Sequence, residues 1–287
     1  MSHVELVARV RKMVEQPSSA LDAPIVYELP DGTSLAELIT AVRLWAGQPR
    51  NLAMGGFTDP SLVESTGAPL VEQFGGELEE MRGWAYKSHW IGCGRIARSG
   101  EARTIVVVAD RRDPAVVGFP EGASWAEKLR ILVGWESTDR TVVDWPATEA
   151  ALGTPLPSDY KEIVEVFGPG CFDDYLDLLV PGTRSSNILL WFQNDAVHAA
   201  ELWEPYSVYP TPGGLLRWGA SEQEITFVWQ TGAPDPDDWR VLVEFHFDEW
   251  ERYDCGMGEF LVRMLTDVQF GFPTRRISTH YFTPNGH

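Results

Sequence analysis

The strongest constraint on the fold is a run of alternating side chains near the C-terminal end of the chain. Apolar residues recur there at every second position, as Val241, Val243, Phe245 and Phe247. A period of two predicts a strand with one face buried and the other exposed. Strand-like segments at 188–192, 215–218 and 225–230 precede it, and a helix with one apolar side is predicted over 257–265. Antiparallel strands with helices at both ends predict an α+β fold.

Two short helices are predicted before these strands. Asp144 can cap the first of them, with Pro146 in its first turn, and Gly153 ends it. The second helix is predicted over 159–167, and a Gly-Pro-Gly sequence at 168–170 ends it. These patterns therefore predict one α+β domain in the second half of the chain, beginning close to residue 141.

The first half gives fewer clear signals. A helix is predicted over 1–16 from valines at helical spacing, and another over 34–45 from a capping box of Ser34 and Glu37. Residues 47–83 are rich in Gly and Pro and predict loops and edge elements, and 84–96 has no clear period. The β-branched run 104–109 predicts a strand. A second capping box, Ser124 with Glu127, predicts a helix over 124–133.

These signals divide the chain into four parts. Residues 1–125 form an unassigned α+β domain, 126–140 a helix and linker, 141–272 the second domain, and 273–287 a C-terminal tail. The chain has 287 residues, which is enough for two domains of ordinary size.

Charge is distributed unevenly between the two halves. The chain carries a net charge of −19; residues 1–140 hold 19 acidic and 15 basic side chains, and residues 141–287 hold 23 and 8, which gives −4 and −15. An acidic surface repels phosphate and anionic lipid and attracts basic proteins. We therefore expect no direct nucleic-acid or membrane partner. No signal sequence and no apolar run of 18 residues is present, so we expect a cytoplasmic protein.

The motifs of catalysis and cofactor binding are weak or missing. The three cysteines form no CxxC pair, no P-loop occurs, and the GxGxxA match at 92–97 is not followed by a predicted helix. Cys171 could act as a nucleophile with His198 or His246 as its base, but a buried structural thiol is the commoner case. We therefore expect that the protein is not an enzyme and that it binds no cofactor and no metal.

The second half resembles the SUKH superfamily. The resemblance rests on an ordered set of residues in the segment 144–172, followed by the strand 218–230, the turn 231–239 and the helix 259–266. The set in the first segment comprises Trp145, Glu149, Leu152-Gly153, Leu156-Pro157, Tyr160, Phe167-Gly168 and Gly170. It covers about residues 140–270 and implies a SUKH-like antiparallel sheet with flanking helices, preceded by a smaller α+β domain.

The resemblance implies protein binding rather than catalysis. Bacterial SUKH proteins are largely immunity proteins, which neutralise a cognate toxin, often a nuclease, and fungal relatives are regulatory scaffolds. A dense group of carboxylates can occupy the basic cleft of a nuclease. The candidate partner-binding residues are Asp173, Asp174, Asp177, Asp235, Asp237, Asp238, Trp239, Glu249, Glu251 and Asp254.

Two other interpretations stay open from the residues. The acidic side chains can be ordinary solvated loop charges, with Trp239 and Trp250 in the core. The protein can also be a cytoplasmic regulatory scaffold without a toxin partner, or, less in keeping with its residues, an enzyme whose site lies in 1–125.

Overall fold

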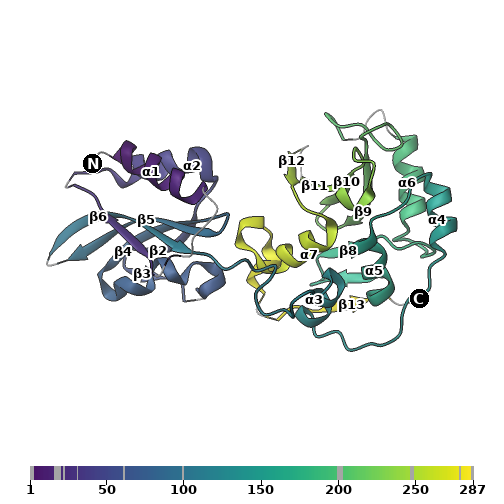
Figure 1. Cartoon of the computed structure of the whole chain (residues 1–287), viewed down its shortest axis with the longest axis horizontal. Coiled ribbons are helices and arrows are strands. Elements are labelled where there is room, and N and C mark those ends of the chain that lie inside the picture. Colours follow the sequence, from purple (N-terminus) through teal and green to yellow (C-terminus); the bar gives the residue numbers. More distant parts are fainter. Residues whose placement is uncertain are drawn as a thin grey trace. The chain divides into compact units, whose positions relative to one another are not determined.

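The computed structural model in Figure 1 describes residues 3–15, 21, 23–30, 32–60, 62–98, 100–198, 203–245, 249–277 and 279–285. The chain forms two compact units. Unit 1 comprises Met1–Val117 and Thr266–Gly271, and unit 2 comprises Gly118–Leu265 and Phe272–His287. Each unit combines helices with one antiparallel sheet, which confirms the predicted α+β class.

Unit 1 is built on a six-stranded sheet in the order β1-β6-β5-β4-β2-β3. Helices α1 and α2 pack on one face of this sheet, and three short 3₁₀ helices between residues 64 and 77 pack on the other. The elements are α1 (His3–Glu15), β1 (Ile25–Glu28), α2 (Leu35–Ala46), β2 (Arg50–Met54), β3 (Phe57–Thr58), β4 (Leu78–Tyr86), β5 (His89–Arg98) and β6 (Glu101–Asp110).

Alternate residues of β6 serve two different cores. Val106 and Val108 pack with the helices, whereas Ile105 and Val107 pack with the 3₁₀ layer. All four side chains are buried because the sheet is covered on both faces. This two-sided burial explains why the run 105–109 is continuously apolar instead of alternating.

Strands β4 and β5 were not predicted, and glycine explains why. Gly83, Gly92 and Gly94 lie at points of close packing, and a Cβ on Gly94 would lie 2.5 Å from the Glu80 carbonyl oxygen. Glycines lower the strand signal of a sequence although they are needed here for close approach. The GxGxxA match at 92–97 therefore lies inside a strand and is no strand-to-helix turn.

Unit 1 is completed by a segment that is distant in sequence. Asp267 is fully buried and forms an ion pair with Arg111, whose side chain is 3% exposed. Asp267 also caps the 3₁₀ helix Val268–Phe270, and Val268 packs against the core of the sheet. The Arg111 guanidinium also lies 5.6 Å from the Trp90 ring centroid. Residues 1–117 alone would leave a buried cation without its anion.

We predict that Asp267→Ala lowers the free energy of unfolding of unit 1 by about 3 kcal/mol or more, because it leaves the Arg111 charge buried and unpaired. Urea unfolding followed by tryptophan fluorescence measures this change. Asp254→Ala, at a carboxylate whose side chain is 81% exposed, is the control and should change stability by no more than about 0.5 kcal/mol. An equal effect of both substitutions would contradict the prediction.

Unit 2 is built on a seven-stranded antiparallel sheet in the order β12-β11-β10-β9-β8-β7-β13. Its elements are α3 (Trp125–Leu132), α4 (Trp145–Leu152), α5 (Ser158–Phe167), β7 (Gly170–Phe172), β8 (Leu176–Leu178), α6 (Ile188–Val197), β9 (Leu215–Ala220), β10 (Thr226–Gln230), β11 (Arg240–Phe245), β12 (Glu249–Tyr253), α7 (Met257–Thr266) and β13 (Phe282–Pro284).

Two predictions for unit 2 were wrong. The segment 188–192 is the first half of helix α6, which begins after Asn187 accepts a hydrogen bond from the Leu189 N–H. Five consecutive apolar residues fit a buried strand or a helix equally well, and the N-cap decides for the helix. Strand β11 is also buried on both faces, because Leu242 packs with Trp203 and Val208 of a covering segment. Residues 246–248 of the predicted strand lie outside the described residues.

The other predicted helices agree with the structure within a residue or two. Ser34, Ser124 and Asp144 are N-caps whose side chains accept from backbone N–H groups, and Gly153 and Gly168 are C-caps. Residues predicted as linker and tail also take part in unit 2. Trp135 donates to the Val166 carbonyl at 3.1 Å, and β13 pairs with β7. None of the described helices is long and apolar enough to cross a membrane.

Candidate functional site

The residues of the SUKH-like set hold the helices of unit 2 on its sheet. The Trp145 indole N–H donates to the Glu165 carboxylate at 2.9 Å, and its ring packs edge-on against Tyr160 at 5.8 Å. Tyr160 in turn packs against Trp229 of β10 and donates its hydroxyl to the Leu179 carbonyl at 2.5 Å. Complete burial raises the pKa of Tyr160, so its hydroxyl stays a hydrogen-bond donor.

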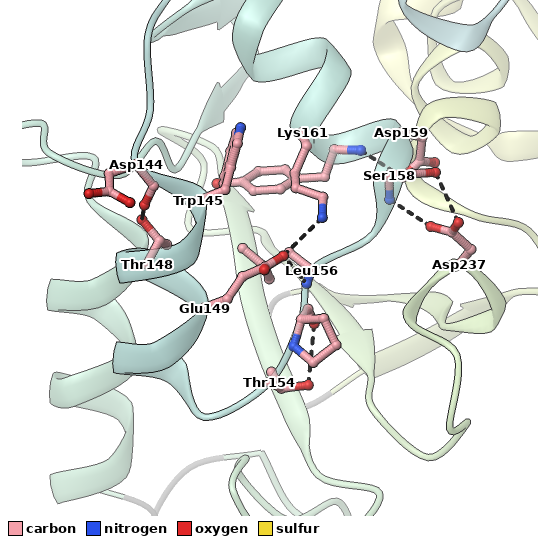
Figure 2. Close-up of polar contacts among 12 residues, drawn as sticks. Asp144, Trp145, Thr148, Glu149, Thr154, Leu156, Ser158, Asp159, Lys161 and Asp237 are labelled. Atoms are coloured by element: carbon pink, nitrogen blue, oxygen red, sulfur yellow. Dashed lines mark hydrogen bonds and ion pairs between the residues drawn. The ribbon is translucent and has the colours of Figure 1, made fainter.

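Glu149 organises the loop between α4 and α5 (Figure 2). Its carboxylate accepts from the Leu156 N–H at 2.9 Å and pairs with Lys161 at 2.9 Å. Burial acts to raise the pKa of Glu149, but these two interactions outweigh it and hold the pKa below its ordinary value. Gly153 at φ 79° starts the loop, in a left-handed conformation that favours glycine.

A pair of carboxylates joins α5 to two other elements at its N-terminus. Asp237 accepts from the Ser158 N–H at 2.6 Å and from its hydroxyl at 2.9 Å, and thereby caps a helix whose preceding residue, Pro157, offers no side-chain cap. Asp159 of α5 accepts a hydrogen bond at 2.7 Å from the backbone N–H of Gly258, which lies in the first turn of α7. Burial raises the pKa of Asp159, and the nearby Asp237 charge acts in the same direction.

The first predicted acidic group, Asp173, Asp174 and Asp177, is held by the C-terminal segment of the chain. Asp173 has a fully buried side chain that pairs with His280 at 2.7 Å and accepts from the Tyr281 N–H at 3.0 Å. The hydroxyl of Tyr281 and that of Thr283 donate to Asp174, and Asn285 donates to Asp177. These carboxylates fasten β13 to the sheet edge.

The second group lies in the turn between β10 and β11. Trp239 is a core residue, 3% exposed, whose indole N–H donates to the Ala233 carbonyl at 2.9 Å. Asp235 caps the 3₁₀ turn Pro236–Asp238, and Asp237 caps α5. Asp238 is exposed, and its carboxylate has no partner among the residues that the structure describes.

The third group lies on β12, which is an edge strand of the sheet. Glu249, Glu251 and Asp254 are all exposed. Asp254 pairs with Arg252 at 2.9 Å, and Glu251 accepts from the Tyr253 hydroxyl. The Glu249 carboxylate has no partner within the described part of the chain.

The structure separates the ten predicted residues into two sets. Eight of them take part in internal contacts or in the core: Trp239, Asp173, Asp174, Asp177, Asp235, Asp237, Glu251 and Asp254. Asp238 and Glu249 present carboxylates to solvent that have no partner among the described residues. The three predicted groups come from different elements.

A buried ion pair of unit 2 was missed from the sequence. Arg217 of β9 forms two hydrogen bonds with Asp195 of α6, at 3.1 and 3.2 Å, and lies over the rings of Trp191 and Trp203. Burial raises the pKa of Asp195, and the Arg217 charge opposes that rise. The pair fixes α6 to the sheet. No local signal marks it because its members are 22 residues apart and belong to elements of different type.

The cysteines are protonated thiols in this environment. Burial raises the pKa of Cys93, and burial together with Asp177 and other carboxylates raises that of Cys171 to about 12. Burial likewise raises the pKa of Cys255 to about 12. A thiol with such a pKa is a poor nucleophile at neutral pH. His198, one proposed base for Cys171, is exposed at the end of α6, and His246 lies outside the described residues.

Within the described ranges, no group of three His, Cys, Asp or Glu side chains is arranged to hold a metal ion. No family model, curated protein or solved structure matches this chain.

We predict that Glu149→Gln lowers the free energy of unfolding by about 1 kcal/mol at pH 7, because it removes a half-exposed ion pair and keeps the acceptor for Leu156. The pKa of Glu149 is lower in the folded than in the unfolded chain. Its stabilising effect is therefore present above the ordinary value of 4.5 and is lost as the pH falls through the lower folded value.

Urea unfolding at pH 7 and at pH 3.5 measures the difference between the Gln variant and the parent chain. The difference should shrink at the lower pH. Glu136→Gln, at an exposed position between α3 and α4, is the control and should change the free energy of unfolding by no more than about 0.5 kcal/mol. A Glu149→Gln effect that does not depend on pH would refute the assigned ion pair.

Proposed function

We propose that the protein is a non-enzymatic protein-binding module, and that unit 2 neutralises a cognate toxin domain with a basic surface, such as a nuclease. The SUKH-like residues support this proposal through the class of protein that they resemble. Charge supports it independently: unit 2 holds 26 Asp and Glu side chains against 11 Lys and Arg, a net −15, whereas unit 1 holds 16 and 12, a net −4.

The observation that carries the proposal is the presence of exposed carboxylates that the fold does not use. Asp238 and Glu249 accept from no described donor, so their charge is available to a partner. A cationic cleft that normally binds phosphates offers the complementary field, which raises association rates and favours the correct partner. Exposed acidic residues in excess also disfavour binding to nucleic acid itself.

An affinity purification of the tagged chain from its own cells, with mass spectrometry of bound proteins, tests the proposal. We expect one dominant basic protein whose toxic activity falls when this chain is added. Its binding should weaken steeply between 50 and 300 mM salt, because the attraction between exposed charges is screened. A diffuse set of housekeeping proteins, or a partner whose binding is insensitive to salt, would count against a toxin-neutralising role.

We predict that Asp238→Lys weakens binding to this partner by roughly 3- to 10-fold at low salt, mainly through slower association. The fold should be unaffected because the Asp238 carboxylate is exposed and has no partner among the described residues; its only such contact is the hydrogen bond from its backbone N–H to the Asp235 carbonyl, which Lys keeps. Glu72→Lys makes the same change at an exposed residue of unit 1 and is the matched control. Surface plasmon resonance gives both rate constants. Equal effects of the two variants would assign the attraction to net charge and not to the surface of unit 2.

Asp237→Lys is a poor probe of binding. The substitution removes the cap of α5 at Ser158 and costs about 1 kcal/mol of stability. A loss of binding in that variant would report on the fold as well as on the interface.

A further inference from the structure

Strand β12 is the longest of the four edge strands in the two described sheets. It is five residues long, Glu249–Tyr253, and contains neither Gly nor Pro. The other three edge strands are shorter or flanked by proline: β13 ends in Pro284, β3 has two residues, and β1 lies between Pro24 and Pro30. An edge strand presents a row of unpaired N–H and C=O groups, and proline removes donors from such a row.

Contacts on both faces hold β12 in place. Trp250 packs against Tyr206 at 5.2 Å and Trp203 at 6.4 Å and donates to the Glu204 carbonyl at 3.2 Å. Tyr253, of the opposite parity, packs against Phe260 of α7 at 4.9 Å. All five residues of β12 are in register with β11. The outer edge of the strand is therefore preorganised for an incoming strand.

The charges of β12 specify what kind of strand can pair with it. Glu249 and Glu251 are two residues apart, lie on the same face and are exposed, while the only cation of the strand, Arg252, is paired with Asp254 at 2.9 Å. Like charges placed opposite each other destabilise a strand pair, so the edge disfavours a second copy of itself. Cations at every second position of a partner strand would lie opposite both glutamates.

We infer that β12 binds an extended segment of a partner that carries Lys or Arg at alternate positions, and that this segment adds an eighth strand to the sheet of unit 2. Backbone hydrogen bonds would supply affinity, and the alternating cations would supply selectivity. The inference rests on the proposed function and names the part of the surface that the basic partner engages.

The test uses the full chain and three fluorescent peptides with blocked ends. The first alternates Thr and Lys over six residues, the second has the same composition in two blocks, and the third is the alternating peptide N-methylated at every residue after the first. Fluorescence anisotropy measures the Kd of each. We expect the alternating peptide to bind at least about 10-fold more tightly than the block peptide, and the N-methylated peptide to lose binding to a similar degree.

The double variant Glu249→Lys/Glu251→Lys should weaken binding of the alternating peptide by at least about 10-fold. Glu249→Lys alone keeps the hydrogen bond from Tyr253 to Glu251 and should weaken that binding by at least about threefold. Glu136→Lys/Glu222→Lys makes the same charge change at exposed positions of unit 2 and should leave that binding within about twofold of the parent chain. Equal binding of all three peptides, or equal loss in both variants, would overturn the inference and leave only a general attraction of opposite charges.

Failure of this inference can be distinguished from failure of the proposed function. A purified basic partner that binds the Glu249→Lys/Glu251→Lys variant as tightly as the parent chain would overturn the role of β12 and leave the proposed function standing. The absence of any basic partner would overturn the proposed function, whatever the peptides show.

Discussion

Unit 2 depends on the burial of a continuous aromatic chain that joins its helices to its sheet. Tyr160 of α5 contacts Trp145 on one side and Trp229 on the other, and Trp229 continues to Trp218 and so to Phe260 of α7. Tyr160, Trp218, Trp229 and Phe260 are fully buried, and Trp145 of α4 packs against Tyr160. Large rings in such contacts contribute much of the apolar area that a domain buries. Packing therefore explains Trp145 and Tyr160, which concern architecture more than the identity of a partner.

The acidity of unit 2 has two separable causes. Some carboxylates are required by the fold, because helix N-termini and the C-terminal strand leave N–H groups that need acceptors. Asp159, Asp173 and Asp237 serve in this way. Other carboxylates, of which Asp238 and Glu249 are the clearest, are exposed, have no partner in the described part of the chain and contribute to the external field. Only the second kind bears on recognition, and a count of acidic residues does not distinguish the two.

Unit 1 shows a different dependence on distant sequence. Its sheet and helices come from the first 110 residues, yet the anion that neutralises buried Arg111 is Asp267. In sequence, the last segment of unit 1, Thr266–Gly271, therefore follows most of unit 2. Because an unpaired buried charge is strongly unfavourable, the packing of Arg111 in unit 1 depends on Asp267 as well as on residues 1–117.

The sequence by itself determined the helices with local signals. Ser34, Ser124, Asp144, Gly153 and Gly168 act at the helix ends through contacts within a few residues, so they can be read from the order of residues. The alternation that begins at Val241 likewise indicated a strand, and β11 covers its described part as far as Phe245. The sequence alone also gives the difference in net charge between the two halves of the chain. It likewise indicated Asp238 and Glu249 as candidate partner-binding residues.

Only the tertiary structure decided which candidate residues are exposed and which are bound. Trp239 and Asp173 are direct neighbours of the exposed residues Asp238 and Asp174. Trp239 is buried through its contacts with Ala233 and Trp229. Asp173 is buried through its contacts with His280 and Tyr281. Tertiary structure also decided that Leu242 is covered by the segment around Trp203, and that Arg111 and Arg217 find buried anions. The physical reason is the same in each case: burial and pairing are set by residues far apart in sequence, and no local pattern records them.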